Sequence, residues 1–241
     1  MRKQCLWLLV GLMLPLCATA QVKWMVKSGI GSSTFIANSG EDSRLFYRLG
    51  GGAIVPLSKR WNLTPALYFS KKGFTFRGAY GSKQIDNAHF SVGMNYVELP
   101  VTVGHRLELG KDCGFSFYLG PYVACGLSAK ARVALDNGNY KHTFKENLFA
   151  ESCDMMGSAY NEKQRKVTLP RFERVDAGLQ MGFELDIDRI LLGVEMDYGI
   201  TPVAHQPIVD PNIVSEIVQK IFFNVENPHH LILQITAGYR F

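Results

Sequence analysis

Cysteine is scarce in this sequence, and so is any large excess of charge. The chain has five cysteines in 241 residues, and only Cys113, Cys125 and Cys153 follow the N-terminal leader described below. An odd, widely spaced set of this kind indicates neither a disulfide framework nor a metal-binding spacing. The formal net charge is +5, which gives no reason to expect an acidic partner, and nucleic acid is not expected for an exported chain.

Long apolar runs are also missing, apart from one at the N-terminus. A short positive start precedes an apolar run at 6–16, and Ala-Thr-Ala at 18–20 is the small-x-small pattern that precedes signal-peptidase cleavage. The run is shorter than the roughly 20 residues that a membrane helix needs. We therefore expect residues 1–20 to be a cleaved signal peptide and the mature chain to begin at Gln21. Cys17 leaves a lipoprotein signal as the alternative.

What the sequence has in quantity is alternation with a period of two. In the segment 175–185, apolar residues occupy every odd position, while Asp, Gly, Gln and Glu occupy the even ones. This period is typical of a strand with two different faces. The segments with this pattern are 24–35, 44–56, 61–77, 97–104, 115–128, 175–185, 192–199 and 231–241.

The second face of these segments indicates a membrane protein. It is rich in glycine and small residues and carries charges of both signs with almost no lysine, which is unusual for a solvent face. A transmembrane barrel alternates lipid-facing and lumen-facing residues, and a small barrel fills its inside with polar side chains. We therefore expect an all-β fold, an eight-stranded antiparallel transmembrane β-barrel. A soluble sandwich or lipocalin-like barrel is the alternative, although shorter strands are the norm there.

The connections between these segments alternate between short and long. The short ones are 57–60, 110–113 and 186–189, and the long ones are 37–43, 78–89, 134–170 and 201–230. Transmembrane barrels have short periplasmic turns and long extracellular loops. We therefore expect one barrel domain over residues 21–241, with both of its ends on the periplasmic side.

Longer motifs resemble a known family. The stretches MNYVELPVTVGHRLEL, FSFYLGPYVACGLSAKARV and RFERVDAGLQMGFELDI, with a closing strand that ends in GYRF, are similar to the outer-membrane β-barrel domain of Bacteroidetes. This group includes PorT-like and "porin family" proteins, and the resemblance spans about residues 22–241. It implies the fold and a location in the cell outer membrane. PorT-like members are associated with protein secretion across the outer membrane, but no motif here ties the chain to that role.

Nine charged residues fall on the face that is predicted to point into the barrel. In a lumen too narrow for bulk water, each charge needs an opposite charge or a hydrogen-bond donor, and eight strands leave room for little besides side chains. We therefore expect a salt-bridged plug, with a narrow path for ions or solutes as the alternative. The nine residues are Arg48, Glu98, Arg106, Glu108, Asp176, Glu184, Glu195, Asp197 and Arg240.

Two pairs of residues are weak candidates for chemistry. His89 and Ser91 share a strand face, as do the base and nucleophile of outer-membrane lipid A deacylases, but the Asn-Gly-Gly that follows the Ser in such enzymes is missing. His229 and His230, with Glu226 and His205 nearby in the chain, could bind a metal, but adjacent residues in a strand point to opposite faces. We therefore expect no enzyme activity, no metal and no cofactor.

The loop 201–230 contains the pattern of an amphipathic helix. Asp210 followed by Pro211 is typical of an N-cap and a first helical position. Apolar residues then recur at helical spacing: Ile213, Val214, Ile217, Val218, Ile221 and Phe222. We expect a helix that covers the barrel mouth as a lid, rests at the membrane interface or docks a partner; a ninth strand over 214–225 is the alternative.

The loop 134–170 is the second candidate for contacts with envelope or extracellular proteins. It suits either surface recognition or a variable loop without a fixed partner. It combines near-balanced charges with large apolar residues: Tyr140, Phe144, Leu148, Phe149, Met155, Met156 and Tyr160.

The final segment, LILQITAGYRF, is predicted to close the barrel. Leu233 and Ile235 lie on the face expected to meet lipid, and Tyr239 and Phe241 continue that face into an aromatic girdle. We expect this strand to pair with 24–35 so that no edge meets lipid, and Tyr239 and Phe241 to be the signal that the barrel assembly machinery reads. The predicted protein is thus an outer-membrane barrel with a structural or surface-interaction role. A PorT-like secretion component and, more remotely, a lipid A-modifying enzyme are the alternatives.

Overall fold

The computed structural model describes most of the chain after the predicted leader. The described residues are 22–36, 41–78, 88–135, 140–143, 147–149, 153–157, 165–169, 172–203 and 229–241. The predicted signal peptide and the predicted helix of the loop 201–230 lie outside these residues, and so both stay predictions.

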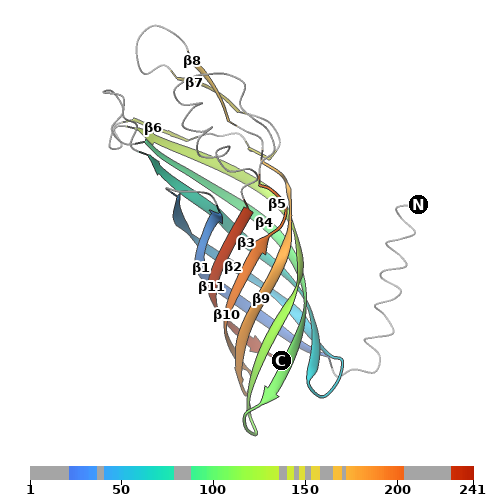
Figure 1. The fold of residues 1–241 in the computed structure, drawn as a ribbon. Coiled ribbons are helices and arrows are strands. Elements are labelled where there is room, and N and C mark those ends of the chain that lie inside the picture. The colour runs from blue at the N-terminus through green and yellow to red at the C-terminus, as the bar shows by residue number, and fades with distance from the viewer. Residues whose placement is uncertain are drawn as a thin grey trace, which may run out of the picture.

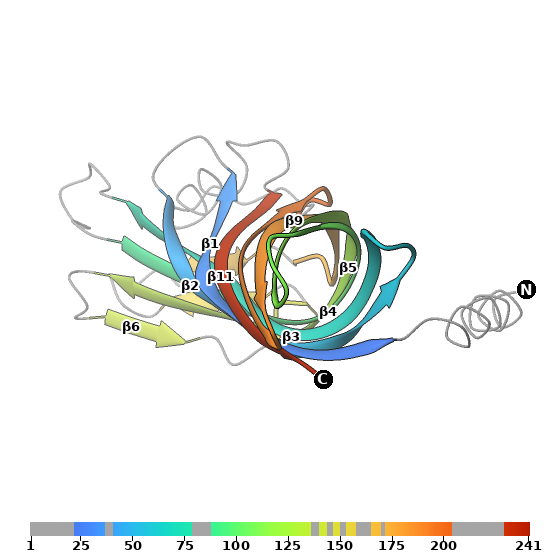
Figure 2. The same ribbon diagram turned by 90° about the horizontal axis from the view of Figure 1, so that it is seen from below.

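Eight long antiparallel strands close into a barrel (Figures 1 and 2). Around the wall, β1 to β5 follow one another, β5 pairs with β9, and β9 to β11 lead back to β1. The barrel strands are β1 (Lys23–Ile36), β2 (Glu41–Pro56), β3 (Trp61–Gly78), β4 (Ala88–Glu108), β5 (Cys113–Leu135), β9 (Val175–Ile187), β10 (Ile190–Gly199) and β11 (His229–Arg240). The predicted fold is therefore confirmed.

The last strand closes the barrel against the first, as predicted. The register runs from Met25 opposite Arg240 to Ile36 opposite His229. Beyond the strand, the Phe241 N–H donates to the Trp24 carbonyl at 2.9 Å. Because every strand has two neighbours, its backbone groups are satisfied without water, which is the condition for spanning a bilayer.

The predicted long connection 134–170 contains short strands of its own. Alternation continues past residue 128, so β5 extends to Leu135 and pairs there with β6 (Tyr140–Thr143). β7 (Cys153–Gly157) and β8 (Arg165–Leu169) form a separate hairpin. β4 also begins earlier than predicted, and β3, β4 and β5 reach beyond their neighbours in Figure 1. We call this the loop end, and the end with the turns at 57–60, 109–112 and 188–189 the turn end.

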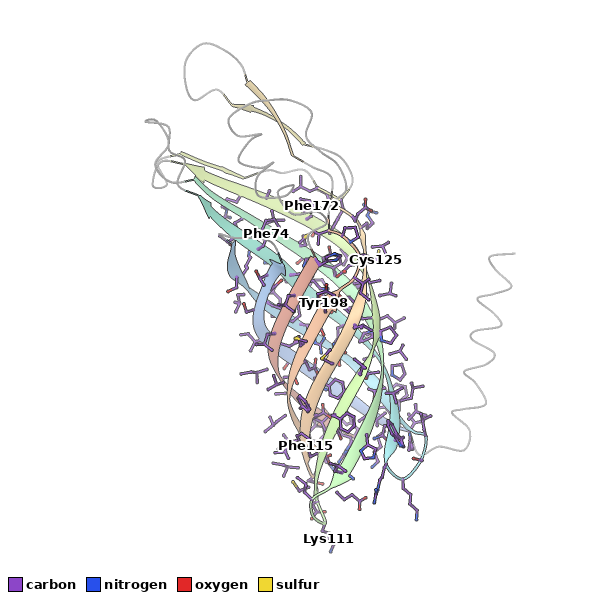
Figure 3. The ribbon with its side chains drawn as sticks, in the orientation of Figure 1. Phe74, Lys111, Phe115, Cys125, Phe172 and Tyr198 are labelled. Atoms are coloured by element: carbon purple, nitrogen blue, oxygen red, sulfur yellow. The ribbon has the colours of Figure 1, made fainter. Side chains whose placement is uncertain are left out.

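The outer surface of the barrel is mainly apolar. On β11, Leu233 and Ile235 are 57% and 67% exposed, whereas Ile232, Gln234 and Thr236 between them are buried. The same alternation exposes large apolar side chains on every barrel strand, and Figure 3 shows them projecting from the wall. No helix among the described residues is long and apolar enough to cross a membrane.

Aromatic side chains gather on the outer surface towards the turn end. The rings of Trp61 and His105 lie 4.9 Å apart, and those of Tyr239 and Phe241 lie 5.1 Å apart, each pair in an edge-to-face arrangement. The Tyr239 hydroxyl accepts a hydrogen bond from Arg189 at 3.3 Å, which raises the pKa of that guanidinium. Such aromatic groups are typical of the boundary between the hydrocarbon core and the headgroups.

Candidate functional site: the barrel lumen

Charged side chains fill the lumen in three groups that follow one another along the barrel. The middle group is Lys27, Arg48, Glu184, Glu195 and Asp197; the loop-side group is Lys72, Glu98 and Asp176; the turn-side group is Arg106, Asp186 and Arg240. Inward-pointing positions of seven strands contribute to them.

The middle group is centred on Glu195 of β10. Its carboxylate pairs with the Arg48 guanidinium and, at 3.2 Å, with the Lys27 ammonium. Lys27 also pairs with Glu184 on the neighbouring strand β9. Arg48 lies 3.4 Å from Asp197, so both cations bridge two carboxylates, and each of the three carboxylates has a cation.

Neutral side chains complete the middle group. The Tyr118 hydroxyl donates to Glu195, and the Gln180 amide donates to Asp197 at 2.8 Å. The Arg48 guanidinium lies over the Tyr68 ring, 4.4 Å from its centroid, a favourable cation–π arrangement. Gly182 makes room for Tyr118, since a Cβ at that position would lie 2.6 Å from the hydroxyl oxygen.

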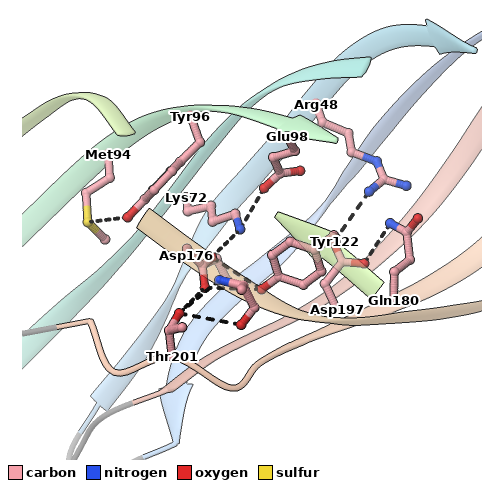
Figure 4. Close-up of polar contacts among 12 residues, drawn as sticks. Arg48, Lys72, Met94, Tyr96, Glu98, Tyr122, Asp176, Gln180, Asp197 and Thr201 are labelled. Carbon is pink, nitrogen blue, oxygen red and sulfur yellow. Dashed lines mark hydrogen bonds and ion pairs between the residues drawn. The ribbon is translucent and has the colours of Figure 1, made fainter. Parts of the chain in front are cut away.

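The loop-side group surrounds one buried lysine (Figure 4). The Lys72 ammonium lies 2.6 Å from Glu98 and 2.8 Å from Asp176. The hydroxyls of Tyr122 and Thr201 donate to Asp176, each at 3.2 Å. The lysine is thus neutralised on two sides, which its complete burial requires.

The turn-side group is partly open. Arg106 binds Asp186 through two parallel hydrogen bonds of 2.9 and 2.7 Å, the bidentate geometry that makes guanidinium–carboxylate pairs strong. Arg240 approaches the same carboxylate at 3.4 Å. Glu108 does not join this group, because its side chain is 75% exposed and lies 3.8 Å from Arg106 at the rim. This corrects its predicted place in the lumen.

The sequence-based list missed three members of the network. The expectation of almost no lysine on the inner face was wrong, because Lys27 and Lys72 are both buried there. Their signal was present: Lys27 follows Met25 by two positions, and Lys72 continues the inward series of Tyr68 and Ser70. Asp186 was also missed, because the turn was predicted to begin there and β9 continues to Ile187.

A small cavity leads from the turn end to the middle group. Its volume is about 60 Å³. Arg106, Asp186 and Arg240 line one part of it, and Lys27 and Glu195 line another. A polar cavity of this volume is large enough for a few water molecules. Where the middle group begins, ion-paired side chains occupy the space.

Apolar side chains cover the lumen at the loop end. Leu148 and Phe149 are buried, and the Phe149 ring packs edge-to-face on Tyr96 at 5.4 Å. Asn147 holds this segment to the wall: its Oδ1 accepts from the Ala129 N–H at 2.9 Å and its Nδ2 donates to a carbonyl of β5 at 3.1 Å. Phe172, labelled in Figure 3, is also buried at this end. Part of the predicted surface loop 134–170 therefore covers the loop end of the lumen.

The sequence matches a family model over residues 19–205, and that model describes the outer membrane protein beta-barrel domain. The chain belongs to this family. Membership implies localisation in the outer membrane. The match does not extend to the finer PorT-like grouping, and no curated protein matches the chain.

Among solved structures, this outer-membrane barrel is similar to several others at low sequence identity. Neisserial surface protein A has 11% identity and a TM-score of 0.38, with 91% of this chain and 97% of that one covered. Ail, the attachment invasion locus protein of Yersinia pestis, in complex with the heparin analogue sucrose octasulfate, has 8% identity, a TM-score of 0.38 and coverages of 92% and 99%. The N-terminal barrel domain of Pseudomonas aeruginosa OprF has 9% identity and a TM-score of 0.33, with 92% of this chain and 100% of that one covered.

The weak catalytic candidates of this barrel lie on the long strand β4, away from the lumen network. Ser91 is opposite Thr75 and Arg132 in register, and its hydroxyl accepts a hydrogen bond from Arg44 at 2.7 Å. His89 lies two positions before it in the strand. Among the described residues, no carboxylate is hydrogen-bonded to Ser91.

The two adjacent histidines of β11 diverge. His230 is buried, with its ring 6.2 Å from that of Tyr96, whereas His229 stacks on Tyr198 at 6.1 Å. Tyr198 lies on the outer wall. The described residues contain no group of three or more His, Cys, Asp or Glu that could hold a metal.

Proposed function

We propose that the protein is a non-conducting outer-membrane barrel with a structural or surface-interaction role, and that it is not an enzyme. The observation that carries this proposal is the ion-paired network, in which seven buried charges of the middle and loop-side groups are paired with one another inside the lumen: Lys27, Arg48, Lys72, Glu98, Asp176, Glu195 and Asp197. A pore needs a continuous aqueous path, and a barrel of eight strands has none to spare once its side chains are paired. Contacts with envelope or extracellular proteins would then be made by the loops 134–170 and 201–230.

The test is the permeability of vesicles that contain the purified protein. Vesicles with the full-length protein should swell in small sugars at the rate of protein-free vesicles. A known porin, reconstituted at the same density, is the positive control. Sugar-dependent swelling well above that of empty vesicles would contradict the proposal.

The alternative role in PorT-like secretion has the family resemblance as its support. The two roles differ in whether the barrel forms a stable complex with other envelope proteins. Extraction in a mild detergent should yield a barrel without stoichiometric protein partners if the role is a surface one. Isolation of a defined envelope complex would favour the secretion role.

The absence of enzyme activity has its own test at Ser91. The hydroxyl of this residue accepts a hydrogen bond from a guanidinium, which is not the arrangement that activates a nucleophile. Ser91→Ala should therefore leave lipid A acylation in cells unchanged, as judged by mass spectrometry of extracted lipid A. A changed acylation pattern, with the variant at normal levels in the membrane, would favour a lipid A-modifying enzyme.

A further inference from the structure

The outer wall of β3, β4 and β5 changes from apolar to polar along one line of register. Phe69, Val97 and Cys125 lie side by side on the three strands, and below them the outward residues are apolar. The next row towards the loop end is Lys71, Asn95 and Ser128, with the exposed Leu127 just before Ser128 at a bulge of β5. Two further rows follow: Gly73, Gly93 and Lys130, then Thr75, Ser91 and Arg132.

Four cations occupy this polar area, and we call them the cationic wall: Arg44, Lys71, Lys130 and Arg132. Lys130 and Arg132 are exposed, and Arg44 and Lys71 are half-buried. None of the four forms an ion pair with another described residue, in contrast to the cations of the lumen. Two acidic residues of β2, Glu41 and Asp42, lie opposite Phe76 and Thr75 in register, at the edge of this area. The four cations therefore outnumber the acidic residues that the register places beside them, and the wall keeps an excess of positive charge.

Arg44 lies flat on the wall. Gly73 and Gly93 face each other across β3 and β4, and a Cβ on Gly93 would lie 3.3 Å from the Arg44 guanidinium. The two glycines thus leave space for the Arg44 side chain to pack on the strands, and its guanidinium donates a hydrogen bond to the Ser91 hydroxyl. Arg132 lies close enough to repel Arg44 electrostatically. Two like charges held near each other in this way would be stabilised by an anion between them.

We propose that the cationic wall binds the phosphorylated headgroup of a lipid whose acyl chains lie along Phe69, Val97 and Leu127. Guanidinium and ammonium groups are the usual partners of phosphate oxygens. Each basic residue at a membrane surface raises the affinity for anionic headgroups by about a factor of five. The hydroxyls of Ser91 and Ser128 and the amide of Asn95 supply further hydrogen-bonding groups on the same face.

The position of the wall favours a lipid over a soluble anion or a protein. The polar rows begin at the next outward position after Phe69 on β3 and after Val97 on β4, and directly after Leu127 on β5. A ligand bound there meets charge on one side and hydrocarbon-facing side chains on the other, including Leu127, which is 50% exposed. Only an amphiphile matches both surfaces at once.

The test is binding of lipid A to the full-length protein in a zwitterionic detergent, measured by native mass spectrometry. Bisphosphorylated lipid A should bind at least tenfold more tightly than its dephosphorylated form. Replacing Lys130→Gln together with Arg132→Gln should weaken binding of the bisphosphorylated form by roughly 30-fold, at about a factor of five for each charge. The exposed turn-end pair Lys59→Gln with Arg60→Gln removes the same charge and should leave binding unchanged.

Several results would overturn the proposal. Equal binding of the two lipid forms, or an equal loss in the turn-end control, would mean that the wall does not recognise the phosphates. Displacement of the lipid by inorganic phosphate at the same phosphate concentration would reveal a free-phosphate site instead. Because Lys130 and Arg132 are exposed, both double variants should fold, and unchanged heat-dependent gel mobility verifies this.

Discussion

Two adjacent lysines illustrate how the face of a strand decides what a side chain does. Lys72 is fully buried between Glu98 and Asp176, whereas Lys71 lies on the outer wall with its ammonium 5.7 Å from the centre of the Tyr47 ring. Residue type, strand and neighbourhood in sequence are the same for both. Their contributions to stability should therefore differ only through burial and ion pairing.

Lys72→Met should lower the free energy of unfolding by about 3–5 kcal/mol, because it leaves two buried carboxylates without a cation. Lys71→Met is the matched control and should change it by less than about 1 kcal/mol. Both are measured by urea unfolding of the protein in vesicles of neutral lipid, followed by tryptophan fluorescence. Equal effects of the two substitutions would mean that the buried ion pairs are not needed for the fold.

At the residue scale, the alternation of faces predicts one inward residue that the sequence-based list omitted, Lys72. The series Tyr68, Ser70, Lys72 already assigns the lysine to the inside, and the structure has it there. Glu108 was assigned to the lumen by the same rule, but it is the last residue of β4, where the wall ends and water is available. Alternation therefore gives the face of a residue, but not its height in the barrel.

At the scale of elements, the local sequence pattern predicts the barrel strands, but it does not predict that the segment 147–149 covers the loop end of the lumen. Alternating faces of about ten residues predicted each barrel strand and its partner, because neighbouring strands only need to match faces. The segment 147–149 has no such periodicity, and its contacts with Tyr96 and Ala129 join residues far apart in sequence. The one local signal is Gly126, where a Cβ would lie 2.5 Å from the Phe149 ring.

Phe149→Ala should lower the free energy of unfolding by about 3 kcal/mol, since it empties a packed site at the barrel mouth. Leu57→Ala, at an exposed turn position, should change it by less than about 0.5 kcal/mol. The same unfolding assay measures both. A change for Phe149→Ala as small as that of the turn variant would mean that the segment is a surface loop after all.

The end of β11 makes a separate prediction about assembly. Phe241 is 68% exposed on the outer surface and contacts Tyr239 edge-to-face, so little of the finished barrel depends on its ring. Phe241→Ala should therefore reduce the amount of protein in the outer membrane several-fold while leaving the unfolding midpoint of purified protein nearly unchanged. Phe117→Ala, another exposed ring on the outer wall, is the control. Normal outer-membrane levels of Phe241→Ala would refute its role as an assembly signal.

At the scale of the whole molecule, the barrel is closed at two levels. Ion-paired groups fill the lumen above the cavity of about 60 Å³, and Leu148, Phe149 and Phe172 cover the loop end. A path for ions would have to break several buried pairs at once, each at a cost of a few kcal/mol. The barrel should therefore not let ions or small solutes cross the membrane.

Single-channel recording in planar bilayers tests this central claim most directly. The purified full-length protein should insert without producing stable conductance steps, in moderate as well as in high salt, because buried ion pairs are screened far less than exposed ones. Insertion itself is verified by protease protection of vesicles prepared from the same sample. Stable steps of large conductance from the wild-type protein would contradict the closed lumen, and with it the proposed function.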